Sequence, residues 1–307
     1  MSSLIEQAAR RLEQLRQAGV ELPDAGVIKP VEPQVPVPAA QAAPQEDAKA
    51  KSKQVTLDLD ALLAQGYLVP QAGRTQLADQ YRVIKRPLIK NAMGKGAASL
   101  NHANLIMVTS ALAGEGKSFT SLNLALSIAA EMDNTVMLVD ADVARPSVMR
   151  VLGLPAGPGL LDVLKGTVDM GDVMLRTNVD KLTLLPSGTP QERATEMLAS
   201  DAMTKLLDHM AKRYPDRIII FDSPPLLLTT ESRVLASHMG QIVVVVHAEK
   251  TQQSAVQQAL ATIESCPLKM MLLNQAAENA AGAYGYGYGY GYGYGYGYGN
   301  EAPKEKA

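Results

Sequence analysis

The 307-residue chain offers few aromatic residues from which to build a core. It has no Trp and 2 Phe, and 8 of its 11 Tyr fall within 284–299, where Tyr and Gly alternate strictly. The aromatic residues elsewhere are Tyr67, Tyr81, Tyr214, Phe119 and Phe221. A folded core must therefore consist of aliphatic residues and Met. The 47% hydrophobic content supplies enough of them for one domain of roughly 200 residues.

Cysteine is also scarce, and a large excess of charge of either sign is missing. The single cysteine, Cys266, excludes an internal disulfide, and four scattered histidines with one thiol offer no zinc-ligand spacing, so we expect a reducing cytoplasm. A net charge of −2 gives no general attraction for nucleic acid, and we expect no nucleic-acid partner. Apolar runs such as 242–246 are far shorter than the ~18 residues that cross a bilayer, so membrane recruitment would need a partner protein.

Composition divides the chain into four segments. Residues 1–20 have the apolar spacing of an amphipathic helix, which would either pack on its own domain or dock on another protein. Residues 21–54 are rich in Pro and Ala, as in an extended linker. We place a folded domain at 55–280 and a flexible tyrosine-cluster tail at 281–307, because Gly at every second position makes an ordered backbone costly.

Within the expected domain, short apolar strands alternate with helices. Helical spacing first covers 55–66 and 75–92, and we expect the second helix to be interrupted or to end near Pro87. Strands are then predicted at 105–109, 136–139, 182–185, 217–221, 242–247 and 268–273. Buried strands separated by helices indicate a three-layer α/β fold, in which helices cover both faces of a mostly parallel central sheet.

A glycine-rich loop follows the first of these strands and precedes a helix. Residues 110–118 read SALAGEGKS, with Ala111 where the full GxxxxGK[ST] motif has its first glycine. Backbone N–H groups here can converge on phosphate oxygens, Lys117 can add positive charge and Ser118 can ligate Mg²⁺. A chance match is the competing interpretation. The residues expected to contact ATP are Ala113, Gly114, Glu115, Gly116, Lys117, Ser118 and Phe119.

Acidic residues follow two other predicted strands. VMLV leads into Asp140 and Asp142, with Arg145 close behind, and IIIF leads into Asp222. A lone Asp after a strand is usually the cap of a helix or turn. Because open α/β sheets bind ligands at the carboxyl ends of their strands, three such features together predict a Mg-nucleotide site.

These motifs resemble the bacterial tyrosine kinases, a P-loop family that phosphorylates a tyrosine cluster at its own C-terminus. The glycine-rich loop resembles the family's Walker A loop, VMLVDADVARP its second Walker motif with Ala144 in place of one arginine, and IIIFDSPP its Walker B motif. EMLASDAM is similar to a family helix but has Ala202 where an arginine is usual. LLNQ, which contains Asn274, resembles the strand end that contacts adenine. The similarity runs from about residue 55 to the end.

The resemblance implies a role for each matching residue. Lys117 would bind the phosphates, and Ser118, Asp140 and Asp222 would hold Mg²⁺. Asp140 is favoured as the proton acceptor, with Asp142 supporting the metal shell, although the sequence does not separate these two roles. Arg145 would either stabilise the transferring phosphoryl group or anchor its loop. The implied phosphoacceptors are Tyr284, Tyr286, Tyr288, Tyr290, Tyr292, Tyr294, Tyr296 and Tyr298.

The helix at 75–92 carries a pattern that bears on assembly. The family packs subunits into a ring through an ExxRxxR pattern, and this chain has Asp79, Arg82 and Lys85, which keep the charge signs but lose the bidentate geometry of the last arginine. A solvated charged helix face is the competing interpretation.

The N-terminal helix, the linker and the segment IKRPL look most like the soluble tyrosine autokinases of exosortase and exopolysaccharide clusters. That subgroup lacks a transmembrane domain of its own, so the resemblance implies a cytoplasmic protein that a partner recruits to the inner face of the membrane. The family's helix pattern implies a ring-like homo-oligomer. The resemblance also implies two partners: a membrane chain-length-determinant or polysaccharide co-polymerase protein as activator, and a phosphotyrosine phosphatase.

Two other functions fit parts of the sequence. Partitioning and division-site ATPases share the superfamily and control partner binding by ATP hydrolysis, but their loop has an early lysine where this chain has Leu112. A self-associating tail would suit the Tyr-Gly alternation but leaves the nucleotide site unexplained. The favoured hypothesis is an ATP- and Mg²⁺-dependent tyrosine autokinase that modifies its own tail in trans and regulates exopolysaccharide synthesis or export.

Overall fold

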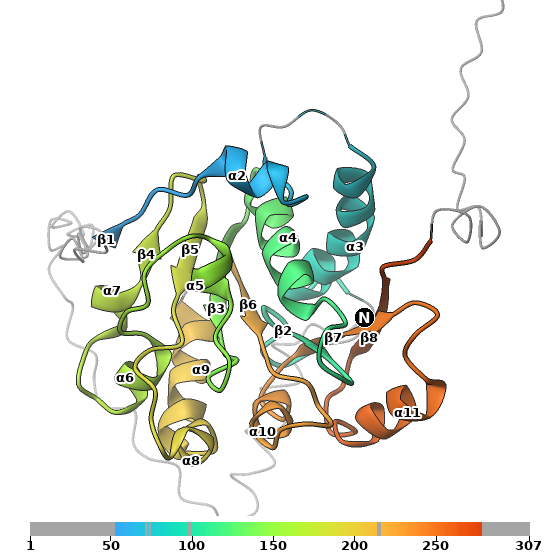
Figure 1. Ribbon diagram of the computed structural model, residues 1–307. Coiled ribbons are helices and arrows are strands. Elements are labelled where there is room, and N and C mark those ends of the chain that lie inside the picture. Colours follow the sequence, from blue (N-terminus) through green and yellow to red (C-terminus); the bar gives the residue numbers. More distant parts are fainter. Residues whose placement is uncertain (1–52, 71–72, 74, 97–99, 214–215, 278–307) are drawn as a thin grey trace, which may run out of the picture. The chain divides into compact units, whose positions relative to one another are not determined.

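An eight-stranded sheet forms the middle layer of the computed structural model, which describes residues 53–70, 73, 75–96, 100–213 and 216–277 (Figure 1). The helix expected at 1–20, the linker up to residue 52 and the tyrosine tail lie outside these residues. Within them, every helix is too short or too polar to span a membrane.

The strands run in the order β1-β4-β5-β3-β6-β2-β7-β8. Their bounds are β1 Lys53–Gln54, β2 Leu105–Ser110, β3 Thr135–Asp140, β4 Leu175–Arg176, β5 Leu182–Leu185, β6 Arg217–Asp222, β7 Gln241–His247 and β8 Lys269–Asn274. The described pairings are parallel except that of β4 with β5. The six predicted strands are confirmed to within one residue at each end. The sequence did not predict β1 and β4, because two residues are too short to show an alternation.

Helices cover both faces of the sheet, which confirms the three-layer α/β fold (Figure 1). One face packs against α2 (Leu59–Ala64), α3 (Gln76–Ala92), α4 (Lys117–Ala129) and α5 (Val148–Val151). The other packs against α6 (Leu160–Leu164), α7 (Met170–Val173), α8 (Ala194–Leu198), α9 (Asp201–Arg213), α10 (Glu231–Ala236) and α11 (Gln253–Ala261). All six residues of β2 are buried, so this central strand contributes to both cores.

Helix α3 continues through Pro87, so the expected break near this residue is wrong. A proline inside a helix leaves the carbonyl four residues earlier, here that of Val83, without its usual donor. The side chain of Val83 is 74% exposed, so this side of the helix faces water, which can supply the missing bond. Tyr81, which precedes the proline, and Leu88, which follows it, are both buried and anchor the helix.

Helix α2 is shorter than the predicted segment 55–66. The Asp58 side chain caps it by accepting a hydrogen bond from the backbone N–H of Ala61 at 2.9 Å. Before this cap the chain is extended, and Val55 N donates to the carbonyl oxygen of Arg176 at 2.8 Å. The end of the predicted linker, from Lys53, therefore belongs to the sheet.

Candidate nucleotide-binding site

The sheet topology brings three strand ends together. β3, β6 and β2 are neighbours in the centre of the sheet, and Asp140 pairs in register with Asp222. Val108 of β2 also pairs with Asp222. Because parallel strands end at the same edge of a sheet, the loop after β2 lies beside both carboxylates.

The loop between β2 and α4 depends on two glycines. Gly114 and Gly116 have φ angles of 83° and 95°, a region that residues with a Cβ adopt rarely. A Cβ on Gly116 would also lie 2.0 Å from Nδ2 of Asn274. Gly116 is the N-cap of α4 and has no side chain to bind the free N–H groups of the first turn. The N-terminus of α4 is therefore arranged to receive an anion.

Glu115 supports this loop from inside. Its side chain is 3% exposed, and Oε2 accepts a hydrogen bond from Leu112 N at 2.6 Å. Oε1 accepts hydrogen bonds from the Thr251 hydroxyl and from His247 N, the latter at 3.5 Å. Asn274 Nδ2 donates to the Glu115 carbonyl oxygen at 2.9 Å. Two residues predicted to contact ATP, Glu115 and Asn274, thus hold the loop in this structure.

Lys117 is paired with one of the predicted acids. Its Nζ lies 2.9 Å from Oδ2 of Asp142, and the two side chains are 15% and 5% exposed. Oδ1 of Asp142 accepts a hydrogen bond from Arg145 N at 3.1 Å, whereas the Arg145 side chain is exposed. Asp142 therefore holds Lys117 at the loop and fixes the turn that carries Arg145.

Asp140 has one satisfied oxygen and one unsatisfied oxygen. Oδ2 accepts hydrogen bonds from Ser147 N at 3.0 Å and from Val148 N at 2.9 Å, while Oδ1 is buried and has no hydrogen-bond partner among the described residues. Burial, and then the nearby charge of Asp222, raise the pKa of Asp140 to about 7. Near neutral pH this carboxyl group is therefore divided between its protonated and its ionised form.

Asp222 completes the acidic pair and is linked to the loop by serines. Its Oδ1 accepts a hydrogen bond from the Ser121 hydroxyl at 3.0 Å, and its Oδ2 accepts one from the Ser147 hydroxyl at 3.4 Å. Burial raises the pKa of Asp222 as well, although the positive charge of Lys117 opposes this shift. The Ser147 hydroxyl also donates to Oγ of Ser118 at 2.9 Å.

Ser147 and Thr251 are site residues that the sequence did not predict. Ser147 directly follows the Arg145-Pro146 end of the second Walker-like motif, and this position is its only signal. Thr251 lies beyond β7, so its contact with Glu115 exists only because β7 is a neighbour of β2 in the sheet.

The acidic pair fits a hard cation such as Mg²⁺. The unpaired Oδ1 of Asp140, the carboxylate of Asp222 and the hydroxyl of Ser118 are oxygen groups, which Mg²⁺ prefers. Burial raises the pKa of both Asp140 and Asp222, so a cation bound beside them would stabilise their ionised forms. No group of three or more His, Cys, Asp or Glu in the described part of the chain could hold a metal ion. Mg²⁺ commonly completes its shell with substrate phosphates and water.

Phe119 lies next to the phosphate-binding loop, in an apolar groove. Its ring contacts that of Tyr67, with the two centroids 5.0 Å apart and the planes inclined by 42°. The groove, of about 600 Å³, continues between α3 and the end of β8 and includes Tyr81, Leu272 and Asn274. A flat apolar group beside the phosphates could therefore bind here.

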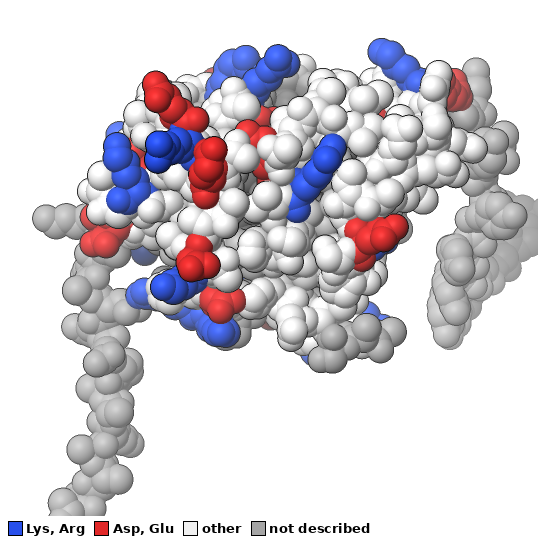
Figure 2. Space-filling view, turned by 90° about the horizontal axis from the view of Figure 1, so that it is seen from below, with Lys and Arg blue, Asp and Glu red and all other residues white. Residues whose placement is uncertain are grey.

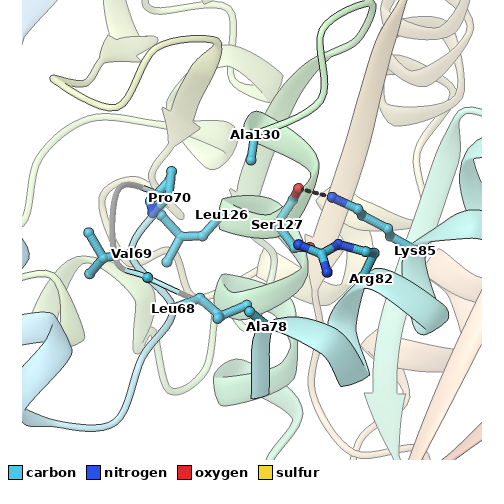
Figure 3. Close-up of a pocket in the computed structure, with 10 residues that line it drawn as sticks. Leu68, Val69, Pro70, Ala78, Arg82, Lys85, Leu126, Ser127 and Ala130 are labelled. Carbon is cyan, nitrogen blue, oxygen red and sulfur yellow. Dashed lines mark hydrogen bonds between the residues drawn. The ribbon is translucent and has the colours of Figure 1, made fainter. Parts of the chain in front are cut away.

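The three residues predicted at an oligomer interface differ in their exposure to solvent. Arg82 and Asp79 form an ion pair on α3 with Nη1 and Oδ1 2.5 Å apart, and both side chains are partly exposed. Lys85 is 5% exposed, and its ammonium lies 2.8 Å from Oε1 of Glu131 and donates to the Ser127 carbonyl oxygen at 2.5 Å. Figure 3 shows Lys85 directed at Ser127 of α4. Lys85 is therefore engaged within its own chain, and a role in assembly remains a prediction for Asp79 and Arg82.

Lys85→Met is expected to lower the free energy of unfolding by about 1–3 kcal/mol, because it leaves the partly buried Glu131 without its nearest cation. Arg86→Met is the matched control. Arg86 lies 3.4 Å from the same Oε1 but is 62% exposed, so its loss should cost less than about 0.5 kcal/mol. Urea unfolding of both variants measures the difference, and equal effects would contradict the structural role of Lys85.

Comparison with known proteins agrees with this geometry. A family model described as an AAA domain matches residues 103–275. Over 187 residues the chain is 35% identical to the tyrosine-protein kinase CpsD of Streptococcus agalactiae, and the alignment covers 59% of this chain and 80% of CpsD. Over 188 residues it is 33% identical to the tyrosine-protein kinase ptk of Acinetobacter johnsonii, with 61% of this chain and 25% of ptk covered. The chain thus spans about a quarter of that longer kinase.

A solved structure shows the same fold. The kinase domain of VpsO superposes with a TM-score of 0.53 and 26% sequence identity, covering 66% of this chain and all of that domain. The matching family model extends from just before β2 to just after β8, and so spans the loop between β2 and α4.

Proposed function

Because the chain belongs to the family of bacterial tyrosine-protein kinases that contain an AAA domain, we propose that it transfers the γ-phosphate of ATP to tyrosines of its own Tyr-Gly repeat. The observation that carries this proposal is the convergence of Lys117, Ser118, Asp140 and Asp222 at one edge of the sheet. The same chain supplies eight tyrosines separated by single glycines in 284–299.

The phosphates of ATP would bind at the N-terminus of α4. Its free N–H groups favour negative charge, and Lys117 would exchange Asp142 for the β- and γ-phosphates. The adenine would lie near Phe119 and Asn274, in the groove beside the loop. Ser118, Asp140 and Asp222 would hold Mg²⁺, some of them through water. Bound Mg²⁺ neutralises phosphate charge and fixes the orientation of the phosphates.

In the transfer, the phenol oxygen of a tyrosine forms a bond to the γ-phosphorus while the bond from that phosphorus to the β–γ bridging oxygen breaks. ADP leaves, and the phenol proton passes to a carboxylate. We assign this proton to Asp140, whose Oδ1 has no hydrogen-bond partner among the described residues, and give Asp142 a supporting role beside Lys117. The Arg145 N–H already anchors its loop, so its exposed side chain is available to the transferring phosphoryl charge.

We further propose that transfer occurs in trans within a ring-like homo-oligomer. The exposed pair of Asp79 and Arg82 on α3 supports an assembly role for this helix. The similarity of the N-terminal segments to exosortase-associated autokinases supports regulation of exopolysaccharide synthesis or export. It also supports a cytoplasmic location at the inner face of the membrane, activation by a polysaccharide co-polymerase protein and reversal by a phosphotyrosine phosphatase.

Incubation of the purified chain with ATP and Mg²⁺, followed by mapping of phosphate by mass spectrometry, tests the proposal. We expect phosphotyrosine within 284–298, and none there in a variant with all eight tail tyrosines changed to Phe. Hydrolysis of ATP with an unmodified tail would favour the ATPase switch and reject the kinase. Mixing the eight-Phe variant with a Lys117→Met chain separates trans from cis, since phosphate on the latter requires transfer between chains.

A further inference from the structure

Strand β8 leaves one edge of the sheet open. It is the last strand in the order, so within the described chain no strand pairs with its outer side (Figure 1). The carbonyl oxygens of Leu268 and Asn274 accept hydrogen bonds from Ile242 N and Ala248 N, each at 2.9 Å. In a parallel pair, alternate residues turn their polar groups to the partner strand. The N–H and C=O groups of 269, 271 and 273 must therefore point away from β7.

The same outward residues expose apolar side chains. Met271 is 66% exposed and Leu273 is 65% exposed. With Val246 of β7 and Val256 and Leu260 of α11 they form the apolar part of a trough of about 620 Å³, here named the β8–α11 trough. Its other lining residues are polar: His247, Glu249, Thr251, Gln253 and Gln257. An apolar edge strand with free hydrogen-bonding groups is a template for one more strand.

The surroundings of the trough favour an uncharged occupant. Figure 2 views the molecule from below the view of Figure 1, so α11 lies on its right. Charged side chains are fewer on this side than on the left. Glu249 is the acidic residue lining the trough, and Lys269 is the charged residue of β8. A segment with apolar rings and no charge therefore fits better than a charged peptide.

We propose that the chain's own Tyr-Gly repeat, 284–299, adds to the open edge of β8 as an antiparallel strand and places its tyrosines in the β8–α11 trough. The repeat begins ten residues after Asn274, so 275–283 can form the return connection and keep the repeat at high effective concentration.

The alternation of the repeat matches this edge. Side chains of an extended strand point alternately to the two faces of a sheet, so every tyrosine of the repeat faces one side and every glycine the other. Residues directly opposite each other in an antiparallel pair share a face, so tyrosines opposite Met271 and Leu273 enter the trough. A shift by two residues restores the same contacts, and different tyrosines can dock in turn.

Docking of this kind has a regulatory consequence, which rests on the proposed function. Each phosphate adds about −1.5 to −2 charges, which are unfavourable beside the apolar side chains of Met271 and Leu273 and the acidic Glu249. Phosphorylation would therefore release the tail from β8, and docked tyrosines would be shielded until they slide out.

Amide hydrogen exchange of the full chain without nucleotide tests the docking. We expect the amides of Met271 and Leu273 to exchange about tenfold more slowly in the natural chain than in a variant with all eight tail tyrosines changed to Ser. The eight-Phe variant should keep the protection, because it keeps the rings. Amides of Met270 and Leu272, which face β7, are the internal reference and should be unchanged.

A surface variant provides the second arm. Met271→Thr with Leu273→Thr keeps strand propensity but removes the apolar contacts, and it should make cleavage of the tail by chymotrypsin several-fold faster. Met132→Thr, at a methionine that is 87% exposed, is the matched control.

Equal exchange in the natural and eight-Ser chains would overturn the docking. Protection that persists in the eight-Ser chain and grows with protein concentration would also overturn it, since β8 would then pair with a second copy. Neither result depends on phosphate transfer, so failure of the docking and failure of the kinase proposal are distinguishable.

Discussion

Lys117→Met is expected to lower the rate of tail phosphorylation by about 10²–10³-fold or more. The ammonium lies at the N-terminus of α4, 2.9 Å from Asp142, where it can move to the transferring phosphate. Removing a positioned donor from a charge that develops in the transition state typically costs this much. Methionine keeps the length and helix propensity of lysine, so the substitution removes mainly charge.

The same substitution leaves Asp142 buried without its cation, so stability must be measured beside activity. Initial rates by phosphotyrosine mass spectrometry should be taken at a temperature where circular dichroism shows both proteins folded. Lys205→Met, at an exposed position of α9, is the control and should retain its rate. A folded Lys117→Met chain with more than a tenth of the natural rate would contradict the role of Lys117.

Asp140→Asn is expected to lower activity and raise the stability of the ligand-free protein. Loss of a positioned proton acceptor and metal ligand should reduce the rate by about 10²–10⁴-fold. The ligand-free protein should become more stable at pH 8, by about 2–4 kcal/mol, because the variant no longer buries a carboxylate beside Asp222.

The pH dependence has a definite sign. The pKa of Asp140 is about 7 in the folded chain and about 4 when unfolded, so between these values the folded state binds more protons. The stability contributed by this group is full below about pH 4 and is lost as the pH rises through 7. The stability advantage of the variant should therefore grow from about pH 4 to 7 and then level off.

Thermal unfolding of both chains between pH 5 and 8, without nucleotide, measures this advantage. Asp133→Asn, at an exposed position before β3, is the control and should show no such dependence. Saturating ATP and Mg²⁺ should reduce or reverse the advantage, because a bound cation favours the ionised carboxylate of the natural chain. An advantage that is constant with pH would show that Asp140 is ionised throughout.

Much of the fold followed from local patterns. The six longer strands are apolar runs bounded by turns, and the phosphate-binding loop is a short contiguous motif, so both are visible in a few neighbouring residues. The continuation of α3 through Pro87 was not visible, because it depends on the burial of Tyr81 and Leu88 against other elements. Packing offsets the lost hydrogen bond, and the sequence does not show which side of the helix will pack.

The candidate site also has residues that the sequence predicted and contacts that only the structure revealed. Lys117, Ser118, Asp140 and Asp222 were predicted because each follows a strand, and the structure brings them together. The sequence grouped Lys85 with Asp79 and Arg82 because of their spacing on the helix. In the structure Lys85 instead pairs with Glu131, in the segment that directly follows α4. Charged residues spaced three apart over two turns of a helix can thus lie partly in solvent and partly in the core.

By itself, the sequence determined the α/β class, the positions of the central strands, the glycine-rich loop and the acids at strand ends, because these depend on periodicity and backbone chemistry over a few residues. Only the tertiary structure decided which distant residues meet. It paired Lys117 with Asp142 and joined Glu115 to Thr251. Among the described residues, it also left one oxygen of Asp140 without a partner and the outer edge of β8 without a strand. The physical reason is that strand order places residues from separate motifs within hydrogen-bonding distance, and strand order is set by packing of the whole sheet.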